Sequence, residues 1–312
     1  MLIRHLHYFI TLARQGHFAK AADACNVTQP TLSSALRKLE EDFGARLVER
    51  DHHFVGLTPE GERVLAWAQQ ISSDFESLKD DMSLKAEDLK GTVRLGVIPA
   101  AMPMTGHFTE YFLRVHPAAS IEIESMSSRQ IQAGLDGLEL HGGLTYLDNE
   151  PLERVNSLPL YREYYVVISR RGHFPDGKPV SWKRLAKEPL CLLGPEMQNR
   201  RILDQAAKRH GAALNAQVTA NSYLTIFSHL QRGGWVSVVP TTLPELYEIG
   251  SRFELRPLAG KPFSQSIGLV VPDRQPMAKM THALFSAVLN SGLPEDMSRM
   301  SPQVDKNFLS IA

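Results

Sequence analysis

The sequence predicts an α/β protein that begins with an all-α helix-turn-helix segment. Two helical patterns joined by a short turn lie within residues 18–43, and after Gly91 apolar strands alternate with helices of about ten to fifteen residues. Such alternation is typical of α/β units with mainly parallel sheets. The chain has 312 residues, of which 43% are hydrophobic, so it can bury more than one core, and we expect about two to three domains.

The first of these elements is the helix-turn-helix. An Ala-rich helix is predicted over residues 18–25 and a second helix over residues 30–43. Thr28 or Gln29 lies near the cap of the second helix, and Pro30 lies close to its first helical position, where a missing N–H costs little. Apolar residues recur along this helix at helical spacing and are expected to face a core: Leu32, Leu36, Leu39 and Phe43.

The start of the second helix carries short polar groups and a guanidinium on its outer sides. Amide and guanidinium groups read base edges in the major groove, whereas hydroxyls and helix N-termini meet phosphates. We therefore expect contacts with double-stranded DNA from Gln29, Pro30, Thr31, Ser33, Ser34, Arg37 and Lys38. Residues 1–58 hold seven Lys or Arg against six acids, so DNA affinity must depend on where the cations lie and not on bulk charge.

Five runs of residues in this region resemble the LysR-type bacterial transcriptional regulators: LHYF (6–9), GHFAKAA (16–22), VTQPTLS (27–33), LEEDFG (39–44) and LTPEG (57–61). The resemblance covers about sixty positions and implies a winged helix-turn-helix DNA-binding domain over residues 1–58. It also implies binding to promoter or operator DNA, dimers that pair into tetramers, and contact with RNA polymerase. A helical bundle without a DNA role would explain the apolar positions, but not the polar ones that begin the second helix.

The resemblance places a wing within residues 50–57. LysR-type proteins tend to carry arginines there, whereas this chain keeps Arg50 and has His52 and His53. We expect these three residues to contact DNA phosphates, the imidazoles only when protonated, because the ordinary histidine pKa lies near 6.5. The alternative is that both imidazoles only pack against the hairpin.

A linker helix is predicted over residues 59–90. Thr58 and Pro59 begin it, and Glu60 lies in its first turn, where the helix dipole favours an acid. An apolar stripe with coiled-coil spacing runs along it: Val64, Ala68, Ile71, Phe75, Leu78 and Met82. The resemblance implies that the stripe pairs with a second copy in a homodimer. The alternative is that it packs on its own chain.

A regulatory domain is predicted over residues 91–293. Strands are expected at residues 93–97, 121–124, 144–147, 164–169, 190–193, 217–220, 235–239 and 266–271. Helices are expected around Phe108 and Phe112, after a capping box formed by Ser127 and Gln130, and at residues 199–210, 223–232 and 277–289.

So many strands favour two α/β lobes, and the resemblance implies a two-lobed, periplasmic-binding-protein-like effector domain. Lobe 1 would hold residues 92–161 and 268–290, and lobe 2 residues 162–267, with the chain crossing near 161–164 and 264–268. Residues 294–312 are polar and are expected to form a flexible tail.

Ligands of such sheets bind beyond the carboxyl ends of the strands. Helix N-termini and hydroxyls there suit an anion, so we expect a small anionic or carboxylate effector in a cleft between the lobes. The candidate residues are Pro99, Ala100, Ala101, Ser127, Ser128, Asn199, Asn221, Ser222, Pro240 and Thr242. Arg129, Arg200 and Arg201 are possible counter-charges. LysR-type proteins usually carry Ser or Thr in the loop that here reads 99–101, so backbone contacts must suffice there or the effector is smaller. For each serine, an N-cap without a ligand is the alternative.

Other classes of protein fit the sequence less well. It has no Gly-rich phosphate loop, no Gly-x-Ser-x-Gly elbow and no histidine pair at metal-ligand spacing, so we expect neither an enzyme nor a cofactor or metal site. A redox sensor would depend on Cys191, which has no partner in the regulatory lobes because Cys25 lies in the DNA-binding domain. An architectural DNA-binding protein with no effector is a further alternative. No signal peptide or long apolar run is apparent, so a cytoplasmic protein is expected.

Overall fold

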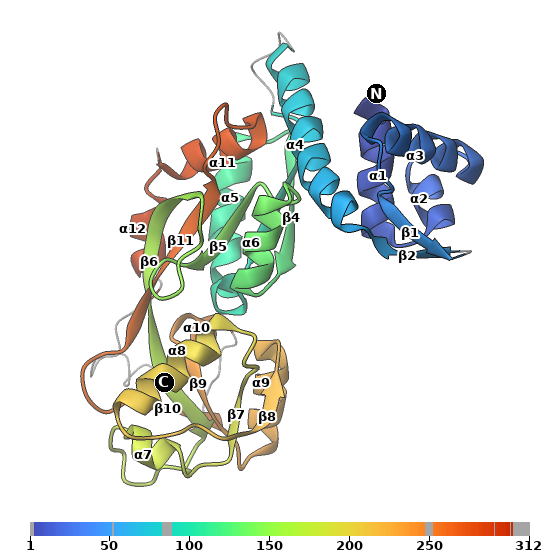
Figure 1. The fold of residues 1–312 in the computed structure, drawn as a ribbon. Helices are drawn as coiled ribbons and strands as arrows, with labels where there is room; N and C mark the ends of the chain where they lie inside the picture. The colour runs from blue at the N-terminus through green and yellow to red at the C-terminus, as the bar shows by residue number, and fades with distance from the viewer. Residues whose placement is uncertain are drawn as a thin grey trace. The chain divides into compact units, whose positions relative to one another are not determined.

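The computed structural model describes residues 3–51, 53–82, 89–246, 252–289, 291–299 and 301. The chain divides into two compact units, Met1–Ala86 and Glu87–Ala312. In Figure 1 the first unit runs from blue to cyan and the second from green to red. Among the described residues, no helix is both long and apolar enough to span a bilayer.

The first unit contains the predicted helix-turn-helix. Its described elements are α1 (Ile3–Gln15), α2 (Phe18–Ala24), α3 (Gln29–Phe43), β1 (Val48–Asp51), β2 (His53–Leu57) and α4 (Pro59–Met82). Helices α2 and α3 are joined by a turn in which Asn26 has a left-handed backbone with φ of 54°. Strands β1 and β2 pair in antiparallel fashion and form the wing. Helix α1, which was not predicted from the sequence, packs on α2, α3 and α4.

The core of this unit is built from the apolar faces of its helices. Its fully or nearly fully buried side chains include Leu6, Phe9, Leu12, Ala21, Ala22, Leu32, Leu36 and Leu39. Phe43, which was expected to face this core, is instead 45% exposed. It is the last residue of α3 before Gly44, whose left-handed backbone ends the helix, and it lies outside the packed cluster.

Helix α3 begins as its sequence predicts. The Thr28 hydroxyl caps the helix by accepting a hydrogen bond from the backbone N–H of Thr31 at 3.4 Å, and Pro30 lies in the first turn. A proline there costs no hydrogen bond, since the first amides of a helix have no partner within it. The polar start of α3 is therefore fixed by local chemistry.

The LTPEG run joins the wing to α4. The Thr58 hydroxyl accepts from the Gly61 amide at 2.9 Å and donates to the Arg46 carbonyl at 2.6 Å. A Cβ atom on Gly61 would lie 2.0 Å from the Leu47 carbonyl oxygen, so no other residue fits without moving the backbone. Glycine is thus required by the close approach of α4 to the segment before β1.

The second unit alternates strands and helices. Its described elements in lobe 1 are β3 (Gly91–Val97), η1 (Pro99–Met104), α5 (Thr105–Val115), β4 (Ala119–Ser125), α6 (Ser128–Asp136), β5 (Gly142–Tyr146), α11 (Lys279–Leu289) and α12 (Leu293–Arg299). Those in lobe 2 are α7 (Trp182–Leu185), β7 (Leu190–Leu193), α8 (Gln198–Arg209), β8 (Ala216–Ala220), α9 (Tyr223–Arg232), β9 (Val236–Pro240), α10 (Thr242–Leu246) and β10 (Phe253–Pro257). Strands β6 (Val155–Arg170) and β11 (Ser264–Pro272) connect them, as Figure 1 shows.

Each lobe has a parallel sheet. Strand β3 pairs in parallel with β4 and β5, and β7 pairs in parallel with β8 and β9. Strand β6 pairs with β11 from Val155 to Tyr164, and from Tyr165 onward it pairs with β9. The chain therefore changes sheet within β6 between Tyr164 and Tyr165, next to the segment 161–164 where the first crossing was expected. Every expected strand overlaps an observed one, while β10 and the first half of β6 are additional.

One core runs through both lobes. It contains Leu95 and Leu144 of lobe 1 as well as Cys191 and Leu193 of β7, whereas Leu192 faces a second core on the other side of the lobe 2 sheet. This division follows the alternation of side chains along a strand. The place where the lobes meet is thus packed, and polar groups there are buried.

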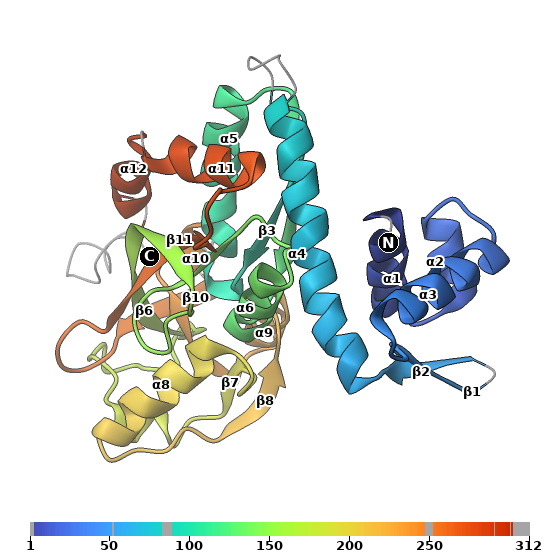
Figure 2. The same cartoon turned by 45° about the horizontal axis from the view of Figure 1, so that its top comes forward.

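The prediction of a flexible tail over residues 294–312 is wrong for the first part of that segment. Residues 293–299 form α12, in which Leu293 and Met297 are buried. Beyond it, the hydroxyl of Ser301 donates to the Arg162 carbonyl at 2.8 Å. Figure 2 shows α11 and α12 beside lobe 1. Leu293 and Met297 hold this segment against the rest of the unit. The prediction failed because the polar composition of the segment as a whole outweighed these two apolar residues.

Candidate functional site

The candidate DNA-reading surface is the outer side of α3. Gln29, Pro30, Thr31, Ser34, Arg37 and Lys38 are exposed and Ser33 is half-buried, while the leucines of the same helix face the core. An exposed amide, hydroxyls and a guanidinium on one helix are the groups that bind base edges and phosphates.

The two cations of this surface differ in their surroundings. Lys38 forms ion pairs with Glu41 at 3.3 Å and Asp42 at 3.7 Å, and the hydrogen bond that its ammonium donates to Glu41 raises the pKa of Lys38. Arg37 is exposed, and it forms no hydrogen bond or ion pair with the residues that the structure describes. Arg37 is therefore the better placed of the two to meet a phosphate or a guanine.

The wing is anchored to the helix-turn-helix by an aromatic contact. In the hairpin, Arg50 pairs with Phe54 and Asp51 with His53. The ring of Phe54 meets that of Phe18 edge-on, with centroids 6.5 Å apart. His52 lies outside the described residues, and so do the side chains of Arg50 and His53. Their predicted contacts with DNA stay predictions.

The apolar stripe of α4 divides into two parts. Ala68 is buried in the core of the first unit, and Val64 and Ile71 pack against that core, so this part is covered by its own chain. Further along, Phe75 is half-buried beneath the Lys79 ammonium and Leu78 is 56% exposed, while the side chain of Met82 lies outside the described residues. Trp67, which the stripe does not include, is 66% exposed.

Eight of the ten predicted effector residues lie at three locations in the second unit, and the other two lie at the start of α6. Pro99, Ala100 and Ala101 are buried in η1, which lies beside α10, the helix that begins at Thr242. Asn199 and Pro240 both meet Tyr165, through a side-chain hydrogen bond and through strand pairing. Asn221 is exposed, and Ser222 caps α9 by accepting from the Leu224 amide at 3.1 Å.

The loop after β3 differs from expectation, since its backbone is not open to a ligand. Ala100 and Ala101 are almost fully buried, and the Ala101 amide donates to the Ile98 carbonyl at 2.9 Å. Ser127 forms the predicted capping box: it accepts from the Gln130 amide and donates to the Gln130 side chain at 2.9 Å. The Ser127 hydroxyl therefore serves the helix. Ser128 is buried beside it.

Of the three arginines considered as counter-charges, Arg129 is exposed, and Arg200 and Arg201 are engaged by other groups. Arg200 makes two hydrogen bonds to Asp204, at 2.9 and 3.0 Å, and one to the Leu214 carbonyl. Arg201 binds Glu150 through two nitrogens, and its hydrogen bonds hold the pKa of that carboxyl below its ordinary value. Neither guanidinium is free for an anionic effector in this arrangement.

A buried polar cluster lies where the lobes meet, and of its members the sequence predicted only Asn199 as a site residue. Tyr146 of β5 donates to Oε1 of Glu163 in β6 at 2.9 Å. Tyr146 accepts from the Tyr165 hydroxyl at 3.0 Å and from Nδ2 of Asn199 at 3.1 Å. The alternation of Tyr161, Glu163 and Tyr165 along β6 was the available signal, because it places three polar residues on one face of a strand.

The environment of Glu163 disfavours its charge. The side chain is fully buried, and burial raises its pKa to about 7, against the opposing effect of the tyrosine hydroxyls. Burial also raises the pKa values of Tyr146, Tyr161, Tyr165 and Tyr223 well above their ordinary value, with the Glu163 charge as a further cause. These four hydroxyls therefore stay protonated at neutral pH.

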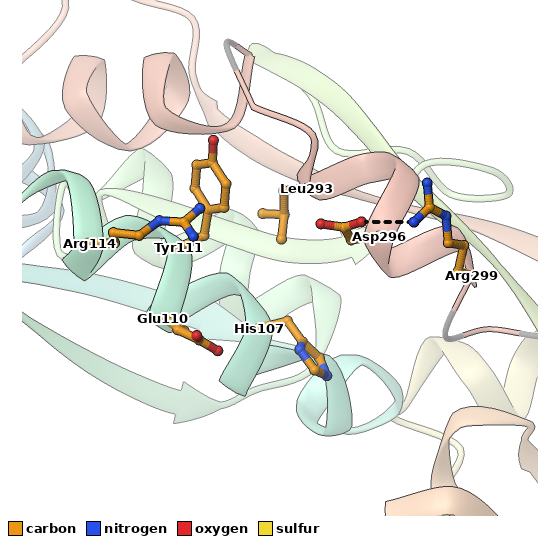
Figure 3. A pocket seen from close by; sticks show the side chains of 7 residues that line it. All are labelled: His107, Glu110, Tyr111, Arg114, Leu293, Asp296 and Arg299. Carbon is orange, nitrogen blue, oxygen red and sulfur yellow. Dashed lines mark ion pairs between the residues drawn. The ribbon is translucent and has the colours of Figure 1, made fainter.

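A separate hollow of about 270 Å³ lies between α5 and α12 (Figure 3). The Arg114 guanidinium stacks on the ring of Tyr111 at 4.6 Å, and Asp296 pairs with Arg299 at 3.6 Å. Its charged lining is thus partly neutralised from within. None of the residues predicted from the sequence lines this hollow.

Fold and surface together define a DNA-binding regulator: a winged helix-turn-helix with a polar reading helix, followed by a two-lobed α/β unit. Residues 3–62 match the model of the bacterial regulatory helix-turn-helix proteins of the lysR family, and residues 86–292 match that of the LysR substrate binding domain. The chain belongs to the LysR family of bacterial transcriptional regulators.

Several known proteins are similar over most of the chain. The hydrogen peroxide-inducible genes activator of Haemophilus influenzae is 35% identical over 299 residues, which make up 92% of this chain and 96% of that protein. The DNA-binding transcriptional dual regulator OxyR of Escherichia coli is 29% identical over 245 residues, 77% of this chain and 79% of that protein.

The solved structures agree in fold. A full-length OxyR variant from Pseudomonas aeruginosa has a TM-score of 0.74 at 25% identity and covers 92% of this chain and 97% of its own. CbnR, a regulator solved in complex with its target DNA, has a TM-score of 0.64 at 19% identity, covering 93% of this chain and 99% of its own. The second likeness concerns the fold alone.

Proposed function

We propose that this regulator binds operator DNA through α3 as a homodimer or a tetramer, and that a small molecule bound where the two lobes meet modulates DNA binding or promoter activation. The observation that carries the proposal is the group of buried polar side chains around Glu163, at the junction of β5, β6, α8 and α9. Burying polar groups without a full set of partners costs free energy, so such a group is typical of a binding site. Contact with RNA polymerase at the promoter belongs to the same proposal.

Dimerisation is proposed to involve α4. Trp67 and Leu78 are both exposed. They are eleven positions apart along α4, which is about three helical turns. They therefore lie on the same side of α4. Large exposed apolar side chains on one side of a helix favour a partner that covers them. A pair of reading heads also explains how a domain with so little net charge can bind specifically.

A thiol-based response is the alternative suggested by the peroxide-inducible relatives. Cys191 is fully buried in β7, and burial raises the pKa of its thiol to about 11. Because the thiolate is the reactive form, this cysteine is inert near neutral pH. We therefore favour a bound small molecule over oxidation of Cys191.

The proposal is tested by DNase footprinting on the intergenic DNA beside the gene. Changing Gln29 to Ala removes an exposed amide from the start of α3 and should weaken operator binding by about 1–3 kcal/mol and relax base preference. The matched control is Gln205→Ala, which removes an exposed amide from α8 of the second unit and should leave the footprint unchanged. Equal titration curves for the Gln29 variant and the wild type would refute the role of α3.

A further inference from the structure

Among the residues of the second unit that the structure describes, two glutamates are buried, and only one of them has a full set of partners. Glu254 accepts from the Phe174 amide at 2.7 Å and from Arg256 at 2.8 Å, so both oxygens are bonded and the charge has a counter-ion. Glu163 is more deeply buried, and its Oε2 has no hydrogen-bond partner in the described part of the chain. An uncompensated buried carboxylate is costly. Glu254 therefore has the partners expected of a structural residue, whereas Glu163 lacks them.

One of the donors near Glu163 is used on its other oxygen, and two more are used on that donor. Tyr165 and Asn199 donate to Tyr146, and Tyr146 donates to Oε1. The hydroxyl oxygens of Tyr161 and Tyr223 are buried and, like Oε2, have no partner among the residues that the structure describes. Both tyrosines lie close enough to Glu163 for its charge to raise their pKa values.

Three buried oxygens of this cluster therefore have no hydrogen-bond partner among the described residues: Oε2 of Glu163, which can only accept when ionised, and two hydroxyls, which can accept or donate. The buried polar residues of the described chain include no Lys or Arg that could donate to them. An ammonium group has three N–H donors and no acceptor, carries the opposite charge to a carboxylate, and is attracted by the faces of aromatic rings. A carboxylate ligand would instead be repelled by the ionised form of Glu163, whereas an ammonium group would favour that form.

We propose that the effector of this regulator carries a protonated amine, which binds to Oε2 of Glu163 and to the hydroxyls of Tyr161 and Tyr223 where the lobes meet. This inference rests on the proposed function, because it assigns a chemical class to the ligand of that site. It replaces the anionic effector expected from the helix N-termini. Ordered water at the three oxygens is the competing occupant.

The test uses the full-length chain and pairs of small molecules that share a carbon skeleton. Butylamine is compared with butyrate, benzylamine with benzoate, and 1,4-diaminobutane with succinate. The melting temperature is measured at rising concentrations up to ~10 mM near neutral pH, because a ligand that binds the folded state raises it in proportion to ln(1 + [L]/Kd). Calorimetry then gives the affinity of each active compound.

Three variants locate the binding group. Glu163→Gln keeps the shape and removes the charge, so amine affinity should fall at least about tenfold, and Tyr223→Phe should weaken it several-fold. Tyr164→Phe is the matched control, because neighbouring residues of a strand face opposite ways, and its amine affinity should equal that of the wild type. Circular dichroism checks that every variant is folded.

The expected result is that at least one amine raises the melting temperature, its carboxylate counterpart does not, and Glu163→Gln abolishes the effect. Three results would overturn the inference: stabilisation by carboxylates alone, an equal amine effect on wild type and Glu163→Gln, or no effect of any pair, which means ordered water only. If one of these results is found but Gln29→Ala still weakens operator binding, only the amine inference is overturned and the proposed DNA-binding function stands. Operator binding that Gln29→Ala does not weaken would overturn the function itself.

Discussion

Replacing Glu163 with Gln should change how the stability of the regulatory unit depends on pH. Burial raises the pKa of Glu163 to about 7 from its ordinary 4.5. Between these values the folded chain holds a proton that the unfolded chain has released, so the free energy of unfolding falls as pH rises. Glutamine has nearly the same shape and no proton that titrates in this range, so the variant should lack this decline.

The size of the effect follows from the difference between the two pKa values. At about 1.36 kcal/mol for each pH unit, the wild type should lose about 3 kcal/mol relative to the variant from pH 4.5 to pH 8. The pKa values of Tyr146, Tyr165 and Tyr223 lie well above 10, so these hydroxyls do not titrate here. His141, whose pKa burial lowers to about 4, contributes equally to both proteins.

Urea unfolding of both proteins at about pH 5, 6, 7 and 8 measures this difference. Trp182 and Trp235 lie in the second unit and report its unfolding by fluorescence. The stability gained by the variant should be small at the lowest pH and should grow toward the highest. If the two stability curves run parallel over the whole range, Glu163 has the same pKa in the folded and the unfolded chain. The argument that burial raises its pKa would then fail.

Three further outcomes are expected. Trp67→Glu with Leu78→Glu should give monomers of the full chain in analytical ultracentrifugation, since a partner helix would have to bury both charges; intact dimers would exclude this side of α4. Peptide-resolved alkylation should label Cys191 far more slowly in the folded chain than in urea, and equal rates would contradict its burial. Operator affinity should rise from about pH 8 to 6, with a salt slope steeper by about 0.9 per added phosphate contact. Fluorescence anisotropy compares the wild type with the double variant His52→Gln, His53→Gln. If both show the same pH dependence, the two histidines do not contribute to operator binding.

Local chemistry was predictable from the sequence. The cap at Thr28 and the capping box of Ser127 with Gln130 both form, because each depends on residues within three positions of one another. The strand at 190–193 has the expected bounds, because a run of apolar residues is buried on both faces of its sheet. These features need no knowledge of what lies across the core.

Contacts between distant residues were not predictable in this way. Glu163 of β6 meets Tyr146 of β5 and, through it, Asn199 of helix α8. No spacing in the sequence brings these residues together; the pairing of β6 with its neighbours does so. Phe43 shows the same limit, since helical periodicity gives the side of a helix but not where its packing partners end. The expectation of an anion at the helix N-termini likewise did not foresee that Glu150 engages Arg201, 51 positions away along the chain.

The fit of Gly61 against the Leu47 carbonyl, with the Thr58 hydroxyl bonded to the Arg46 carbonyl, makes the wing and α4 move as one piece. Helix α4 has 24 residues and is therefore a lever arm about 36 Å long. A tilt of about 10° at its far end displaces the wing by about 6 Å, close to the length of two base pairs. In a dimer, a change of that size in each arm would alter the spacing of half-sites that the two reading heads can span.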